Sequence, residues 1–260
     1  MKDVQNSPDN RNIPIKKAGI KSLQYPITVL DRQNKSQETT AIVSMYVDLP
    51  HNFKGTHMSR FVEVLNKHHG RISVEETDSI LYTMLERFDC ETAHFDITFP
   101  YFIEKEAPSS KARSLMNYNC SLLTSLEMKS GTEVFDRIIE VSVPVTMLCP
   151  CSKEISDEGA HNQRSIVTVR VRSSELVWLE ELIEIAESEA SAPVFSLLKR
   201  EDEKALTEAA YQNPLFAEDA VRAVASRLKE DERIIWYQVE SENQESIHNH
   251  NAYAMVEETK

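Results

Sequence analysis

The chain has 260 residues, 41% of them hydrophobic, which is enough to bury the core of one large domain or of two smaller ones, and no run of about 18 apolar residues predicts a membrane span. The formal net charge of −13 argues against duplex DNA or an anionic membrane as the main partner, because both require a basic surface. The 5 glycines stand too far apart for the dinucleotide-binding fingerprint or the P-loop, so both motifs are excluded.

The first half of the chain opens with a polar segment, residues 1–24, whose two prolines predict an N-terminal arm. Hydrophobic periodicity then predicts, in chain order, a strand over 39–47, helices over 57–69 and from residue 73, and strands over 94–103 and 114–128. Ser73 and Glu76 form a capping box at the start of the second helix. Lys129-Ser130-Gly131-Thr132 predicts a hairpin turn into a strand that runs through Met147.

The second half repeats this order of elements. After the strand through Met147, the patterns predict a strand over 165–172, helices over 175–189 and 214–229, and strands over 233–240 and 248–256. Pro214 suits the first turn of its helix. The charged residues 199–213 predict a helical insertion between the two helices.

Each half therefore follows the order β-β-α-α-β-β. We predict an α+β protein with two tandem ββααββ units, residues 25–130 and 131–260, each with an antiparallel sheet and helices on one face. The two halves show no residue-level repeat, so a single α+β domain with a symmetrical order of elements is the alternative. Open sheet edges favour assembly of several chains into a ring.

The 4 cysteines are too few for a disulfide scaffold in a chain of this length, and Cys149 and Cys151 are too close together for an ordinary structural bridge. The first 20 residues lack the apolar core of a signal peptide. Both observations favour a reduced, cytoplasmic setting.

Cys149, Cys151 and His161 form the most informative group in the sequence. They follow a predicted strand in a loop-like run that contains Pro150 and Gly159. Thiolate and neutral imidazole are good ligands for zinc or a neighbouring first-row metal, but a catalytic site usually takes three ligands from the protein and leaves one position for water.

Two segments further along the chain contain candidates for the third ligand. One is Glu203, and the other is His248 with His250, which would share a strand face. Ordinary structural roles are the alternative. The Cys-x-Cys pair suits two small core residues, the charged run 199–204 suits a solvated helix face, and the two histidines suit a sheet edge.

At this point the sequence resembles GTP cyclohydrolase I of type B, the prokaryotic form, over essentially its whole length. The resemblance is carried, in order, by Asp3-Val4-Gln5-Asn6, Gly55-Thr56-His57-Met58-Ser59-Arg60-Phe61, Cys149-Pro150-Cys151-Ser152-Lys153-Glu154, His161-Asn162-Gln163-Arg164-Ser165, Asp202-Glu203-Lys204, Thr207-Glu208, Ala210-Tyr211, Asn213-Pro214, Phe216, Glu218-Asp219 and Glu245-Ser246-Ile247-His248-Asn249-His250.

The resemblance implies the tunnelling fold, as two tandem ββααββ units, in a homotetramer with active sites at subunit interfaces. It also implies the conversion of GTP and water to 7,8-dihydroneopterin triphosphate and formate, the first step of tetrahydrofolate biosynthesis. The negative charge of the chain predicts neither nucleic acid nor a membrane as partner. A divalent metal ion, Mn²⁺, Zn²⁺ or Fe²⁺, would lower the pKa of bound water.

The family's functional residues carry over to positions in this chain. Cys149, His161 and Glu203 would be the metal ligands. Cys151 and His248 would transfer protons, since thiols and imidazoles titrate near neutral pH when perturbed. Glu218 would accept N1–H and the exocyclic amine of guanine in a bidentate pair. The triphosphate would contact cationic and hydroxyl side chains, for which the candidates are His57, Ser59, Arg60, Arg164, Lys199 and Arg200.

Two other functions are compatible with these residues. One is a related cyclohydrolase whose pterin product carries a cyclic phosphate. The other is a metal-binding oligomer without turnover. Ordinary surface charge is the alternative for Arg60 and Lys199.

Overall fold

The computed structural model describes residues 5, 7, 9–51, 53–68 and 76–260. The chain forms two compact units, one of Met1–Pro100 with Ser121–Ile138 and one of Tyr101–Cys120 with Ile139–Lys260. Within the described residues, no helix is long and apolar enough to cross a membrane.

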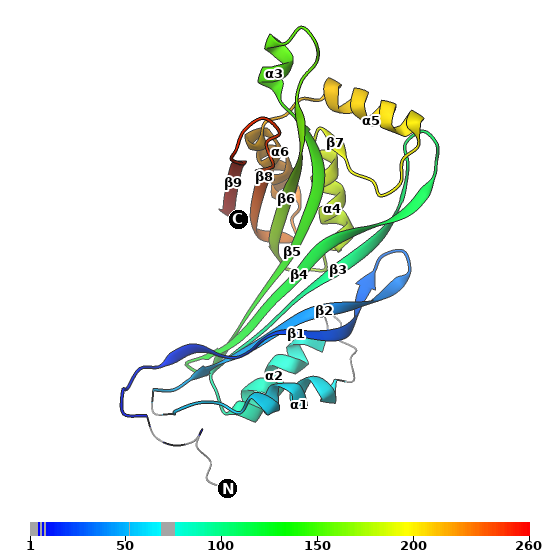
Figure 1. The fold of residues 1–260 in the computed structure, drawn as a ribbon. Helices are drawn as coiled ribbons and strands as arrows, with labels where there is room; N and C mark the ends of the chain where they lie inside the picture. Colours follow the sequence, from blue (N-terminus) through cyan, green and yellow to red (C-terminus); the bar gives the residue numbers. More distant parts are fainter. Residues whose placement is uncertain (1–4, 6, 8, 52, 69–75) are drawn as a thin grey trace. The chain divides into compact units, whose positions relative to one another are not determined.

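The first unit is an antiparallel sheet with two helices packed on one side (Figure 1). Its elements are β1 (Ile15–Asp31), β2 (Lys35–Leu49), α1 (Met58–Lys67), α2 (Glu76–Phe88) and the adjoining parts of β3 (Thr92–Glu106), β4 (Arg113–Lys129) and β5 (Thr132–Leu148). Burial alternates along β2 as the sequence pattern predicted. Val43 and Met45 are fully buried, whereas Ile42, which pairs with both β1 and β3, is 48% exposed.

The second unit continues the strand order from β5 through β6 and β8 to β9, with β7 paired to β5. Its further elements are α3 (Pro150–Ile155), β6 (Asn162–Ser173), α4 (Leu179–Ser188), β7 (Ala192–Pro193), α5 (Arg200–Gln212), α6 (Ala217–Glu230), β8 (Ile234–Asn243) and β9 (Ala252–Thr259). Val167, Val169 and Val171 of β6 are fully buried, and α4 contacts β6 while α6 contacts β8 and β9.

Two tyrosine–glutamate hydrogen bonds, one buried and one partly buried, attach α4 to the β3–β4 hairpin. Tyr101 donates to Glu180 at 2.6 Å, and Tyr118 donates to Glu187 at 2.7 Å. Lys105 also donates to Glu187, at 2.6 Å. Burial lowers the pKa of Lys105 although Glu187 opposes that shift. Helix α4 is therefore positioned by polar contacts as well as by apolar packing.

The predicted order of elements is confirmed in both halves. It is β1-β2-α1-α2-β3-β4 and then β5-β6-α4-α6-β8-β9, with α3, β7 and α5 as additional elements. The turn between β4 and β5 lies where it was predicted, with Ser130 and Gly131 at φ values of 52° and 81°. The compact units cut across the predicted division at residue 131, because Tyr101–Cys120 packs with the second unit.

Several predicted boundaries were wrong. The N-terminal arm is shorter than residues 1–24, because β1 begins at Ile15. Helix α4 begins at Leu179 and not at residue 175. Pro214 precedes its helix, since α6 begins at Ala217. The predicted capping residue Ser73 lies outside the described residues.

Candidate functional site

Cys149 caps the N-terminus of the short helix α3. Its Sγ accepts a hydrogen bond from the backbone N–H of Ser152 at 3.3 Å, and Pro150 occupies the first helical position, where a missing N–H costs nothing. Cys149 is partly buried, Cys151 is exposed, and all four cysteines are free. The segment predicted as a loop is thus a turn of helix that holds the thiol of Cys149 in one orientation.

His161 returns the chain to the same point. The backbone N–H of Cys149 donates to the carbonyl of His161 at 3.1 Å, and the N–H of His161 donates to the hydroxyl of Ser152 at 3.1 Å. On the ring, Nδ1 lies 3.1 Å from Oε1 of Gln163. The structure therefore brings Cys149 and His161 together, and Nε2 is the ring nitrogen left for a ligand.

A small apolar cluster joins the segments that carry the three predicted metal ligands. It consists of Leu148, Ala192 and Ala210, with Ala160 and Leu206 packed against them. Leu148 precedes Cys149, Ala160 precedes His161, and Leu206 is one helical turn beyond Glu203 on α5. Packing of this cluster holds α5 beside the Cys149–His161 pair.

Glu203, by contrast, is not grouped with Cys149 and His161. It lines a pocket of about 290 Å³ together with Asn162 and Arg164 of β6. Side chains alternate along a strand, so this pocket lies on the opposite side of β6 from Gln163, the neighbour of His161. In the part of the chain that the structure describes, no three His, Cys, Asp or Glu side chains are grouped to hold a metal ion. The three-ligand set stays a prediction.

The donor chemistry of Cys149 and His161 fits a first-row divalent metal. The sulfur of Cys149 is oriented by a hydrogen bond from the backbone N–H of Ser152. The imidazole of His161 is oriented by a hydrogen bond at Nδ1, which is how metal-binding histidines are usually held. Glu203 is exposed in the first turn of α5, so its side chain has room to take other rotamers.

The segment between β8 and β9 contacts both His161 and Gln163. Ser246 Oγ lies 3.4 Å from Nδ1 of His161, and Glu245 accepts a hydrogen bond from Gln163 at 3.3 Å. The prediction that His248 and His250 share a strand face is wrong, because β9 begins only at Ala252. Their rings instead stack with centroids 5.2 Å apart in this exposed segment.

Glu218 is exposed in the first turn of α6. The loop before this helix is attached to the metal-ligand segment, because the N–H of Leu215 donates to the carbonyl of Leu148 at 3.1 Å. Lys153 of α3 lies over the ring of Tyr211 at 4.4 Å, which attaches α3 to the end of α5. The beginnings of α3 and α6 are therefore neighbours.

The predicted triphosphate ligands divide between the two units. Arg164 lines the pocket with Glu203, and Lys199 and Arg200 are exposed at the start of α5. In the first unit, His57 and Arg60 line a pocket of about 390 Å³, next to Ser59 in the first turn of α1.

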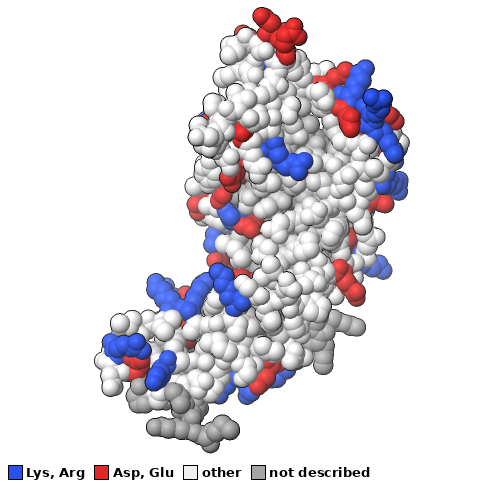
Figure 2. Space-filling view, viewed as in Figure 1, with Lys and Arg blue, Asp and Glu red and all other residues white. Residues whose placement is uncertain are grey.

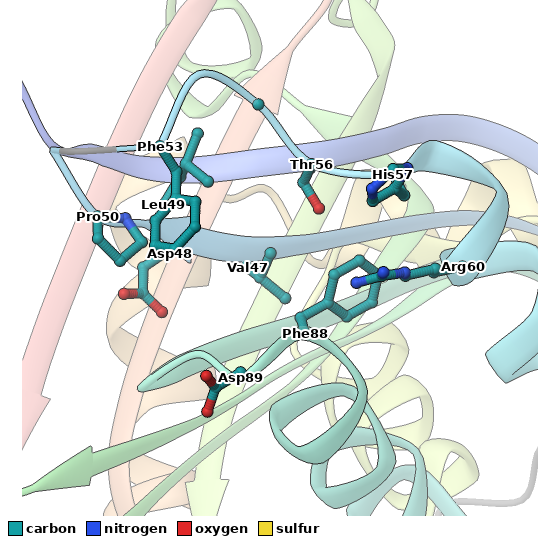
Figure 3. Close-up of a pocket in the computed structure, with 11 residues that line it drawn as sticks. Val47, Asp48, Leu49, Pro50, Phe53, Thr56, His57, Arg60, Phe88 and Asp89 are labelled. Carbon is teal, nitrogen blue, oxygen red and sulfur yellow. The ribbon is translucent and has the colours of Figure 1, made fainter. Parts of the chain in front are cut away.

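The pocket of the first unit is not purely cationic. Figure 3 shows the carboxylates of Asp48 and Asp89 at one side and His57 and Arg60 at the other. Oδ1 of Asp48 accepts hydrogen bonds from the backbone N–H groups of Glu91 and Thr92. The two carboxylates oppose the attraction of this pocket for a triphosphate.

Asp202 is a residue whose role the sequence did not reveal. The run 199–204 suggested a solvated helix face, yet Asp202 has no exposed surface. Its carboxylate accepts hydrogen bonds from the N–H groups of Ser109, Ser110 and Lys199 at 2.8–2.9 Å and from the Ser110 hydroxyl at 2.6 Å. Asp202 thus attaches the start of α5 to the β3–β4 hairpin. The only sequence signal was its place as the third residue of the helix after Lys199.

Charge on the visible surface is mixed. On the face shown in Figure 2, Lys and Arg side chains occur in small groups with Asp and Glu nearby, separated by large uncharged areas. A continuous basic surface, of the kind that binds duplex nucleic acid, is absent from this face for the residues drawn in colour.

The fold places the chain in a structural class. It aligns with urate oxidase from Bacillus sp. TB-90 at a TM-score of 0.58 and 10% identity, covering 95% of this chain and 100% of that one. Urate oxidase from Bacillus subtilis 168 gives the same TM-score and identity, with 94% and 98% coverage. The chain therefore has the tunnelling fold, as the resemblance implied, although identities this low say nothing about chemistry.

Sequence comparison identifies the family. Residues 1–254 match the family model described as type I GTP cyclohydrolase folE2. The protein named GTP cyclohydrolase FolE2 from Geotalea uraniireducens is 55% identical over 100% of this chain and 94% of its own length. Those from Syntrophotalea carbinolica and Geobacter sulfurreducens are 56% and 54% identical, over 95% and 99% of their own lengths. The chain belongs to the type I GTP cyclohydrolase folE2 family.

Proposed function

We propose that this protein is a GTP cyclohydrolase, which hydrolytically opens the imidazole ring of GTP in the first step of tetrahydrofolate biosynthesis. The products would be 7,8-dihydroneopterin triphosphate and formate. The observation that carries the proposal is full-length identity of 52–56% to proteins named GTP cyclohydrolase FolE2. The pairing of Cys149 with His161 in the structure supports it.

The metal site would consist of Cys149, His161 and Glu203. A bound Mn²⁺, Zn²⁺ or Fe²⁺ ion would lower the pKa of a water molecule and so supply hydroxide near neutral pH. A thiolate, an imidazole and a carboxylate do not select strongly among these ions. For Glu203 to join the other two, its side chain must leave the pocket that it lines with Arg164.

Three further residues would act on the substrate. Glu218 would accept N1–H and the exocyclic amine of guanine, and its place at the exposed start of α6 leaves the carboxylate available for this. Cys151 and His248 would transfer protons during ring opening and reclosure. Both side chains are exposed, Cys151 on α3 and His248 before β9.

The triphosphate would be held by cationic side chains. Arg164, Lys199 and Arg200 are the candidates in the second unit, and His57, Ser59 and Arg60 those in the first. Because Asp48 and Asp89 share the pocket of the first unit, we expect the second-unit group to contribute more of the affinity.

The active enzyme would be a cytoplasmic homotetramer. The free state of all four cysteines supports a reducing compartment. Among the residues that the structure describes, β1 and β9 each have one side without a partner strand in the sheet, and such edges favour pairing between chains.

The test is turnover of GTP by metal-free protein reconstituted with Mn²⁺, Zn²⁺ or Fe²⁺, with formate and the pterin product measured together. We expect formate and a dihydropterin triphosphate from the wild type, and at least a hundredfold less from Cys149→Ala. Cys90→Ala, which alters a thiol of the first unit, serves as the matched control and should retain activity.

Other outcomes would redirect the proposal. A cyclic-phosphate product, recognised by its mass, would indicate the related cyclohydrolase. Metal binding without any change of GTP would indicate a non-catalytic metal-binding oligomer. A Glu218→Gln variant with unchanged kcat/KM for GTP would refute the guanine contact while leaving the reaction in place.

A further inference from the structure

Gln163 connects the imidazole of His161 to a carboxylate of the segment before β9. Its Oε1 lies 3.1 Å from Nδ1 of His161, and its Nε2 donates to Oε1 of Glu245 at 3.3 Å. The residue is only 7% exposed, so water does not readily replace either contact. Gln163 is two positions after His161, and this spacing directs both side chains to the same side of the chain.

The carboxylate determines which way the amide points. An ionised carboxylate can only accept hydrogen bonds, so Gln163 must turn its NH₂ group toward Glu245 and its oxygen toward His161. An amide oxygen can also only accept, so Nδ1 of His161 must carry the ring proton. Nε2 then holds the lone pair with which a neutral imidazole binds a metal.

Ser246 is compatible with the same assignment. Its hydroxyl lies 3.4 Å from Nδ1 of His161, farther than the oxygen of Gln163. A hydroxyl oxygen accepts as well as donates, so it can share the Nδ1 proton without changing the tautomer. The hydroxyl by itself imposes no direction on that bond, whereas the amide held by Glu245 does.

We propose that Gln163, held by Glu245, is a positioning residue that sets the tautomer of His161 and so presents Nε2 to a divalent metal ion. The inference rests on the proposed function only in taking His161 as a metal ligand. The neutral imidazole of a free histidine favours the proton on Nε2. In that form Nε2 must lose its proton, or the ring must change tautomer, before Nε2 can bind a metal ion. The Gln163–Glu245 pair removes this cost before the metal arrives.

The tautomer can be measured on the metal-free protein, independently of GTP. Protein labelled with ¹⁵N-histidine at about pH 8, above the ordinary imidazole pKa of about 6.5, would give a multiple-bond ¹⁵N–¹H spectrum in which each ring shows where its proton sits. The His161 signals are assigned by their loss in His161→Asn. We expect the Nδ1–H form in the wild type and mainly the Nε2–H form in Gln163→Leu.

Metal affinity provides the second measurement. Titration with Zn²⁺ should show about 10- to 100-fold weaker binding for Gln163→Leu. Ser246→Ala is the matched control, because it removes the other neighbour of Nδ1 and should leave the tautomer unchanged. Glu245→Gln lets the amide of Gln163 turn over, so it should give a mixture of tautomers while His161 and Gln163 both remain.

The outcomes separate this inference from the proposed function. An Nε2–H tautomer in the wild type, or no change of tautomer in both Gln163→Leu and Glu245→Gln, would overturn the role of Gln163 whatever the enzyme does to GTP. If Gln163→Leu does not fold, as judged by circular dichroism, the Glu245→Gln result decides. If the wild type and the variants show the expected tautomers but the wild type does not turn over GTP, the result would count against the proposed reaction alone.

Discussion

Gly19 allows strands β1 and β2 to approach closely because it has no side chain. A Cβ added at this position in β1 would stand 1.9 Å from the carbonyl oxygen of Met45 and 2.8 Å from Cα of Tyr46, both backbone atoms of β2. Backbone cannot move aside as a side-chain tip can. We expect Gly19→Ala to lower the free energy of unfolding by about 1–3 kcal/mol, measured by urea denaturation.

Gly55 supplies the control for this prediction. Among the described residues, a Cβ at Gly55 would meet the side chain of Gln5, at 3.9 Å, which is an ordinary contact. Gly55→Ala should therefore remain close to the wild type. Equal stability of the two variants would contradict the close approach at Gly19.

Asp202 links stability to pH. Burial by itself would raise the pKa of Asp202, but the hydrogen bonds from Ser110, Lys199 and Ser109 outweigh it and hold that pKa well below its usual range. The folded state then stays charged where an unfolded aspartate, with a pKa of about 3.9, takes up a proton. The stabilisation is complete above about pH 4 and is lost as the pH falls through the folded-state pKa.

We expect Asp202→Asn to melt at a lower temperature than the wild type at pH 7 and to show a weaker dependence on pH between about 4 and 2. Thermal unfolding followed by circular dichroism at several pH values checks this. Glu208→Gln on the same helix is the control, because its ion pair with Lys204 is exposed and 3.8 Å long. Parallel pH curves for wild type and Asp202→Asn would refute the linkage.

At the scale of elements, α4 depends on a buried ion pair. Lys105 and Glu187 are 11% and 16% exposed in their side chains, and Tyr118 donates to the same carboxylate. Removing Glu187 leaves the charge of Lys105 largely buried without its counter-charge, beside the neutral carbonyl of Val194. We expect Glu187→Ala to lower the free energy of unfolding by about 3–5 kcal/mol in urea denaturation.

An apolar replacement of the whole group tests the reason for that loss. The triple variant Lys105→Met, Tyr118→Phe and Glu187→Leu removes all three polar side-chain groups together, and the carbonyl of Val194 loses its hydrogen bond from Lys105. Its stability should return close to that of the wild type. A triple variant as unstable as Glu187→Ala would show that packing, and not the unpaired charge, causes the loss.

The proposed metal site is a property of the tertiary structure, since its three ligands would come from the N-cap of α3, the segment before β6 and α5. A ligand that binds only the folded state stabilises it, by about 2.7 kcal/mol at a hundredfold excess over Kd. We therefore expect chelator-treated protein to melt at a higher temperature when Mn²⁺ or Zn²⁺ is added. Cys149→Ser should remove this shift, and an equal shift in that variant would argue for a different metal site.

Assembly is the other property at this scale. We expect light scattering to give a mass about four times the 29.7 kDa of one chain. Tyr253 and Met255 of β9 are 58% and 49% exposed on this edge strand. Lysines at both positions should reduce the mass without loss of secondary structure, because charge at an edge discourages pairing. An unchanged mass would place the contact between chains elsewhere.

Much of the fold was predictable because local rules decide it. Alternation located β2 and the turn at Ser130 and Gly131 located the β4–β5 hairpin, since period-two burial and positive φ depend on neighbouring residues only. The pairing of Cys149 with His161 was also predictable, because twelve positions separate them around one short helix.

The order of the elements, the family and the chemical types of the candidate ligands follow from the amino-acid sequence alone. The fold, by contrast, buries Asp202, leaves His248 ahead of a strand, places Glu203 and Arg164 along one pocket, and sets Gln163 between His161 and Glu245. Each of these depends on segments distant along the chain, such as the 82 positions between Gln163 and Glu245. Contacts of that kind arise from packing, and no periodicity within a segment encodes them.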